Sequence, residues 1–167
     1  TGVTEEITDA IVKMISDTDP EVMEVHKVDK SDFLRFDLLL IGLSTWFDGD
    51  LQSDWGDYYE TFKTIDFSEK IVAIYGVGDQ YGYPEYFIDG VGILAKTILE
   101  NGGTVIGNWP STGYDFTDSK ASKDESTFFG LAIDEDNQSD LTESRLKYWV
   151  FKVKKEYASI KTAIVNG

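Results

Sequence analysis

Apolar residues recur along this chain in two alternating patterns. Near its beginning, Ile7, Ile11 and Met14 lie three or four positions apart, which is the spacing of one face of an amphipathic helix. Near-continuous apolar runs such as "DLLLIGLS" and "KIVAIYGVG" follow, and such runs are typical of strands covered on both faces. The pattern predicts helices over residues 4–16, 86–103 and 142–157. It predicts strands over residues 21–28, 37–44 and 70–78, and two strand pieces over 104–109 and 128–134.

Strands and helices that alternate in this way form an α/β fold, in which a doubly wound parallel sheet carries helices on both faces. The chain shows no repeat, linker or low-complexity segment, so residues 1–167 are expected to form a single domain. In such sheets ligands bind beyond the carboxyl ends of the strands. The segments that follow the strands are therefore where chemistry is expected.

The charge balance limits the classes of partner that the chain can bind. Lys and Arg total 15 against 31 Asp and Glu, a net charge of −16, which argues against binding nucleic acid or anionic membranes. The same charge favours electropositive protein partners. No apolar run approaches the roughly 20 residues of a membrane span, and no signal peptide is visible. We therefore expect a cytoplasmic protein with no membrane insertion.

The residue types also limit the chemistry. The chain has no Cys, which removes disulfides, thiolate nucleophiles and Cys-ligated clusters. Its single histidine, His26, lies in "EVMEVHKVD" and is expected on a strand surface, so no metal site and no Ser-His-Asp triad are predicted. Any redox chemistry would need a bound organic cofactor.

The first segment of interest is "TGVT" at residues 1–4. Glycine permits close backbone approach, and the helix that follows presents free N–H groups to an anion. The motif is consistent with a charge-neutral phosphate site or with an ordinary threonine cap beside a glycine turn.

Two further segments follow strands and carry aromatic residues. "LSTWFDGDLQSDW" places Ser44, Thr45 and Trp46 after the 37–44 strand, and this Trp either plugs the core or offers a flat stacking surface. "GVGDQYGYPEYF" places Tyr81 and Tyr83 on a glycine-rich turn after the 70–78 strand. Together with the first segment, they predict a flat ring held between aromatic side chains, with its phosphate tail on the helix.

These segments, with "GYDFTDSKA" and "FFGLAIDEDNQSDLTESRLKYWV", resemble the flavodoxins, in particular the long-chain kind of oxygenic phototrophs, over residues 1–157. The resemblance implies a flavodoxin-like five-stranded parallel sheet of order 2-1-3-4-5, with its last strand split at about 110–127. It implies a monomer with one non-covalently bound FMN that transfers single electrons and is not an enzyme. Basic faces of ferredoxin-NADP reductase or photosystem I would be its partners.

The resemblance also implies which residues bind FMN. Residues 1–4 match the phosphate loop, Trp46 and Tyr83 match the aromatics on the two flavin faces, and the backbone of Asp79 and Gln80 matches the pyrimidine edge. Phe47 stands where the family often has Asn, in the turn that reorients on reduction. The implied FMN-binding residues are Thr1, Gly2, Val3, Thr4, Ser44, Thr45, Trp46, Phe47, Asp48, Gly49, Gly78, Asp79, Gln80 and Tyr83.

Three rival functions remain to be separated. A signalling receiver domain needs an Asp at the end of the central strand, but that strand ends "IGLSTW" with no Asp before Asp48. A flavin-dependent oxidoreductase resembling quinone reductases and a flavin-free binding module stay open as alternatives. A visible spectrum of the purified protein would separate them from an FMN carrier.

The end of the chain raises a question of connectivity. "SIKTAIVNG", residues 159–167, is apolar and β-branched like the family's first strand, which does not precede "TGVT" in this sequence. One hypothesis is a circular permutation that places residues 160–166 between the 21–28 and 37–43 strands, with Gly167 close to Thr1. The other is a cropped N-terminus together with an incidental tail at the carboxyl end. The permutation is the one we expect, because the sheet needs a central strand.

Overall fold

The computed structural model describes residues 2–167, so the predicted phosphate contact of Thr1 lies outside the described residues. Two long parallel strands form the centre of the sheet: β1 (Leu38–Trp46) and β3 (Ile71–Val77). The other side of β3 pairs with β4 (Thr104–Ile106) along its first half and with β8 (Leu131–Ile133) along its second. The predicted split of the last strand is confirmed.

Smaller strands complete the β-structure. The short strand β2 (Asp50–Leu51) folds back antiparallel onto the end of β1. The insertion between β4 and β8 forms a separate three-stranded sheet of order β5-β7-β6. Its strands are β5 (Trp109–Pro110), β6 (Ser122–Asp124) and β7 (Thr127–Phe128).

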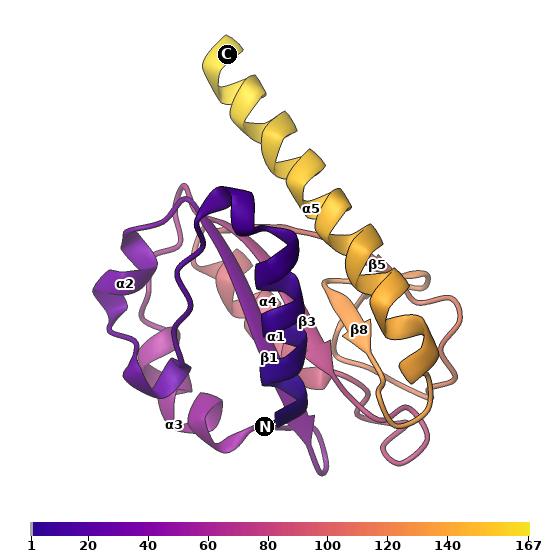
Figure 1. Cartoon of the computed structure of the whole chain (residues 1–167). Helices are drawn as coiled ribbons and strands as arrows, with labels where there is room; N and C mark the ends of the chain where they lie inside the picture. Colours follow the sequence, from indigo (N-terminus) through magenta and orange to yellow (C-terminus); the bar gives the residue numbers. More distant parts are fainter. Residues whose placement is uncertain (1) are drawn as a thin grey trace.

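Helices cover both faces of the central sheet, as the alternating pattern predicts. Successive residues of β3 point to opposite faces, so Val72 and Ile74 join one apolar cluster while Ala73 and Tyr75 join the other. The first cluster packs under α3 (Ser53–Phe62) and α4 (Asp89–Glu100), and the second under α1 (Gly2–Met14) and α5 (Ser139–Asn166). Figure 1 shows α1 and α5 in front of the sheet and α4 behind it. The predicted α/β class is confirmed.

The segment between α1 and β1 differs from its prediction. Residues 21–28 do not form a strand: a 3₁₀ turn, η2 (Val25–Lys27), follows an earlier one, η1 (Ser16–Thr18), and precedes the short helix α2 (Lys30–Leu34). An alternating segment becomes a strand only where a neighbour accepts its backbone hydrogen bonds. Within residues 2–167, no strand lies on the side of β1 away from β3, except β2 at its end.

The predicted strand at residues 160–166 is also wrong, and with it the placement of this segment beside β1. The segment continues α5, which runs unbroken to Asn166. No Gly or Pro interrupts this helix before Gly167, and Thr162 Oγ1 donates to the Ala158 carbonyl within it. Figure 1 shows the carboxyl end of α5 projecting from the body, far from the amino end of α1.

Across residues 2–167, no helix combines the length and the apolar character that crossing a membrane requires.

Candidate functional site

Three of the predicted segments meet at one edge of the sheet. Ser44 and Val77 form the last pair between β1 and β3, so the turns that follow these strands leave the sheet at the same edge. A buried hydrogen bond of 2.7 Å between Thr4 Oγ1 and Ser44 Oγ joins the first turn of α1 to the same edge. Figure 1 shows the amino end of α1 beside the arrowhead of β1.

The amino end of α1 has the features of an anion site. The first N–H groups of a helix have no acceptor within the helix, and a helix of 13 residues carries partial positive charge there. Gly2 is exposed, and a Cβ built on it would meet nothing within 4 Å, so the approach to these N–H groups is open. Val3 packs against the second apolar cluster and so anchors the first turn of α1 to the body of the protein. The first turn contains Glu5 and no basic residue, so backbone groups would do the binding.

The turn after β1 displays two aromatic rings. Trp46 is half-buried and pairs with Asp50, while Phe47 is 65% exposed at the tip beside the exposed Asp48. Gly49 has a φ of 88° and donates its N–H to the Phe47 carbonyl at 2.9 Å. Glycine is required there, because a Cβ would also lie 2.8 Å from a carboxylate oxygen of Asp89.

Thr45 anchors this turn to the next helix. Its Oγ1 accepts the N–H of Gly90 at 3.0 Å, in the first turn of α4. The Thr45 hydroxyl, predicted near the flavin, therefore also holds the start of α4 in place.

The turn after β3 is held by the side chain of Asp79. Its Oδ1 accepts the N–H of Tyr81 at 3.1 Å and of Gly82 at 2.8 Å, and these bonds, the Gly82 one foremost, hold the pKa of this carboxyl below its usual range. Tyr83 is 41% exposed on the outer side of the turn. Gly78 permits the tight exit from β3, since a Cβ there would lie 3.0 Å from Ile88 Cγ2.

Gln80 differs from the other predicted site residues because it faces inward. It is fully buried, and its N–H donates to the Asp134 carboxylate at 3.1 Å. Any contact from its backbone to a ligand therefore falls to its carbonyl. Asp134 and Asn137, which hold Gln80 and Asp79, were not among the predicted residues. The available signal was an Asp directly after the last apolar strand piece, in "LAIDEDNQ".

This donor and ring set fits FMN. The open amino end of α1 and two turns that carry exposed or half-exposed aromatic rings lie at one edge of the sheet. The rings can stack on a flat heterocycle, and the helix end can take a phosphate without a cationic side chain.

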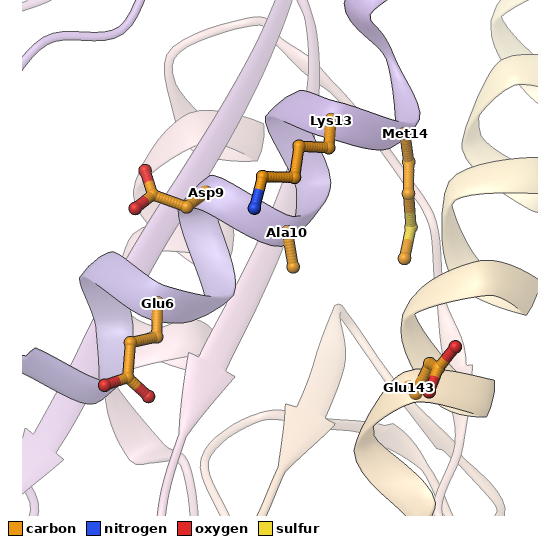
Figure 2. A pocket seen from close by; sticks show the side chains of 6 residues that line it. All are labelled: Glu6, Asp9, Ala10, Lys13, Met14 and Glu143. Carbon is orange, nitrogen blue, oxygen red and sulfur yellow. The ribbon is translucent and has the colours of Figure 1, made fainter.

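One hollow lies elsewhere, between α1 and α5, with a volume of about 520 Å³. It is lined by Glu6, Asp9, Ala10, Lys13, Met14 and Glu143, none of which is a predicted FMN residue. Figure 2 shows Ala10 and Met14 directed into the space between the two helices. Within residues 2–167, no cluster of three or more His, Asp or Glu side chains could hold a metal ion.

His26 lies on the turn η2 instead of on a strand. It is exposed, and its Nε2 is 3.1 Å from the Glu24 carboxylate while its Nδ1 is 3.6 Å from that of Asp54.

A doubly wound sheet that brings an open helix end and aromatic turns together at one edge is typical of nucleotide-binding α/β proteins. The model of the Flavodoxin family matches residues 1–149 of the chain, and the chain belongs to that family. It is 42% identical over 156 residues to flavodoxin 1 of Escherichia coli K12, covering 93% of this chain and 89% of that protein. It is 47% identical over 155 residues to the flavodoxin of Synechocystis, covering 92% and 91%.

The fold agrees with this assignment. A crystal structure of Fusobacterium nucleatum flavodoxin bound to flavin mononucleotide superposes with a TM-score of 0.88 at 29% identity, covering 93% of this chain and 92% of that one. The resemblance to the flavodoxins inferred from the sequence motifs is thus confirmed, while the likeness to the long-chain kind of oxygenic phototrophs stays a prediction. Flavodoxins are FMN-dependent electron-transfer proteins and not enzymes, so this chain is an electron carrier that serves redox partner proteins.

Proposed function

We propose that this chain binds one FMN non-covalently across the turns 45–49 and 78–83 and carries single electrons at low potential. The observation that carries the proposal is the Thr4–Ser44 hydrogen bond of 2.7 Å, because it holds the open amino end of α1 beside the aromatic turns. The bound FMN supplies the redox chemistry, and the protein orients it and limits its access to water.

The amino end of α1 would hold the phosphate. Gly2, Val3 and Thr4 contribute N–H groups of the first helical turn, and Thr1 would complete the loop. The open space over Gly2 leaves room for the phosphate oxygens. Ser44 acts through Thr4, whose position its hydroxyl fixes.

The two turns would hold the ring. Trp46 and Tyr83 would stack on its two faces, and the backbone of Gly78, Asp79 and Gln80 would meet its edge. Asp48 and Gly49 shape the turn that carries Phe47, which Gly49 closes by its bond to the Phe47 carbonyl. The ring would thus be held by stacking and backbone contacts, without a charged partner.

The surrounding charge would set the potential. The turns proposed to hold FMN carry Asp48, Asp50 and Asp79, in a molecule of net charge −16. At an effective dielectric of about 20, each carboxylate close to the ring would oppose negative charge there by roughly 1–4 kcal/mol before screening. These carboxylates would therefore keep the potential of the bound cofactor low.

The same charge suggests the partners and the working state. Basic docking faces, such as those of ferredoxin-NADP reductase or photosystem I, complement a net charge of −16. We propose that residues 1–167 work as a single-domain monomer, since like-charged copies repel each other. A cytoplasmic location stays a prediction from the sequence.

The proposed site is tested by titrating the chain with FMN and following the quenching of flavin fluorescence. Trp46→Ala and Tyr83→Ala should each weaken binding by about tenfold or more, because each removes a stacking face. Tyr148→Ala, which removes an exposed ring on α5 away from the site, should bind like the parent. If both site variants bind FMN as tightly as the parent, the turns are not the site.

A further inference from the structure

A buried carboxylate connects the loop after β8 to the turn after β3. Asp134 follows β8 directly and is fully buried. Its Oδ2 accepts the backbone N–H of Gln80 at 3.1 Å and the Gln80 side-chain amide Nε2 at 2.6 Å. Its Oδ1 accepts the backbone N–H of Asn137 at 3.1 Å, and Asn137 Nδ2 lies 3.0 Å from both oxygens. Every hydrogen-bond partner of this carboxylate is a donor.

The connection continues through both partners. Asn137 Nδ2 also donates to Asp79 Oδ1 at 2.9 Å, the oxygen that shapes the turn. Gln80 Oε1 accepts the N–H of Asp115 at 2.6 Å, and this bond connects the turn to the insertion between β4 and β8. The N–H of Gly78 donates to the Ile133 carbonyl at 3.0 Å. The inner side of the 78–83 turn is therefore fixed throughout, while its outer side stays exposed.

Only a carboxylate satisfies this arrangement. An amide of the same size has one oxygen and one NH₂ group, and in either orientation its NH₂ would face N–H donors of Gln80 or Asn137. An apolar replacement would leave these donors without an acceptor, and an unsatisfied buried donor is costly. Burying a charge is also costly unless hydrogen bonds compensate it. Tyr81, Gly82 and Tyr83 are exposed, so packing does little to fix the 78–83 turn. The hydrogen bonds to the Asp134 carboxylate therefore hold its geometry.

We propose that Asp134 is a positioning residue for the flavin. Together with Gln80 and Asn137, it sets the position of the Asp79–Gln80 backbone and of Tyr83 against the edge and face of the ring, without touching the flavin itself. The inference rests on the proposed function, in which this turn meets the ring. A turn that is ordered before binding costs less entropy when the ligand arrives, so the buried carboxylate raises affinity for the ring.

The test uses the full chain with Asp134→Asn, titrated separately with FMN and with riboflavin. Both affinities should fall by the same factor, about tenfold or more, since charge-assisted hydrogen bonds are the stronger kind. The ratio of FMN to riboflavin affinity should stay at the parent value, because the phosphate end is untouched. The visible absorption band of the bound flavin should shift, which a change in overall stability would not cause.

Asp136→Asn is the matched control. It makes the same change of charge two residues further on, at an exposed position, and should keep both affinities and the parent spectrum. Asn137→Ala is the second variant, because it removes the bond to Asp79 at an exposed residue and cannot collapse the core. Asn137→Ala should lower the affinities for FMN and for riboflavin by the same factor. It tests the positioning role if Asp134→Asn does not fold.

The inference is wrong if a folded Asp134→Asn chain binds both flavins like the parent, or if its loss is confined to FMN. It is equally wrong if Asp134→Asn does not fold and Asn137→Ala binds both flavins like the parent. Trp46→Ala and Tyr83→Ala in the same assay separate this result from a failure of the proposed site. If those two weaken binding and Asp134→Asn does not, only the positioning role is refuted.

Discussion

At the scale of single residues, Phe47 carries backbone strain. Its φ is 42°, and a left-handed conformation costs an L-residue about 1–2 kcal/mol. Its ring is exposed, so packing offsets little of that cost. Asn tolerates this conformation better, so Phe47→Asn should raise the free energy of unfolding of the flavin-free chain by about 0.5–1 kcal/mol. Urea denaturation would measure the change.

Tyr81→Asn is the control for this prediction. Tyr81 is an exposed aromatic on the neighbouring turn and has no positive φ, so its replacement should change stability by less than about 0.5 kcal/mol. If Phe47→Asn stabilises the chain no more than Tyr81→Asn does, Phe47 is not strained.

Tyr114 gives the stability a dependence on alkaline pH. Burial raises the pKa of Tyr114 to about 12 from its ordinary 10, opposed by the Arg145 guanidinium over its ring. Between these values the unfolded chain loses a proton that the folded chain keeps, so stability falls as pH rises. The pKa difference corresponds to about 2–3 kcal/mol by pH 12.

Tyr114→Phe removes this dependence. At about pH 9 the variant should be less stable by about 1–2 kcal/mol, because the hydroxyl donates to the Ala132 carbonyl and accepts from Trp109 Nε1. The difference from the parent should shrink as the pH approaches 12, and urea denaturation at about pH 9 and pH 11.5 would show it. A difference that stays constant over this range would contradict the buried, late-titrating phenol.

At the scale of elements, the sequence predicted those parts whose signal is local. β1 and β3 are long apolar runs, and they pair directly over their length, so the turns that follow them were placed correctly. The predicted helix over residues 86–103 is found as α4, and Gly102, with a φ of 89° just after its end, has the left-handed conformation typical of a glycine that follows a helix. The hydrophobic pattern did not predict helix α3, because its segment is polar and buries only Trp55 and Phe62.

The wrong or missed predictions concern segments whose conformation depends on residues far away in the sequence. Residues 21–28 alternate like a strand, but a strand forms only beside another strand, and within residues 2–167 none lies there. The bonds from Asp134 to Gln80 span 54 residues and leave no trace in periodicity. Residues 160–166 have the composition of a strand. They are helical because helix α5 precedes them and continues through them without interruption.

The end of α5 should be dispensable. Beyond Ala158 its contacts include an exposed ion pair of 3.0 Å between Lys161 and Asp37, the partly buried Ile160, and Lys161 Nζ over the ring of Tyr157 in the same helix. Exposed pairs contribute about 0–1 kcal/mol. A chain truncated after Ala158 should therefore lose less than about 2 kcal/mol of unfolding free energy and keep its FMN affinity. Loss of cooperative unfolding in the truncated chain would show that this segment has a structural role after all.

At the scale of the whole molecule, the net charge of −16 should govern encounters with partners. The Debye length falls from about 30 Å at 0.01 M to about 8 Å at 0.15 M ionic strength. Over that range, the second-order rate of electron transfer to a basic reductase should fall by about tenfold or more. Stopped-flow mixing would measure it, with a neutral small-molecule reductant as the salt-independent control. Equal rates with the reductase at both ionic strengths would refute electrostatic steering.

This chain is an electron carrier that uses FMN, and we propose that it takes up electrons one at a time on a single bound FMN. The most direct measurement is a potentiometric titration of the FMN-loaded chain followed by its visible spectrum. We predict one flavin per chain and two resolved one-electron steps, with the second at the lower potential because of the surrounding negative charge. Uptake of both electrons in one step, as in free flavin, or a folded chain that retains no FMN, would contradict the account.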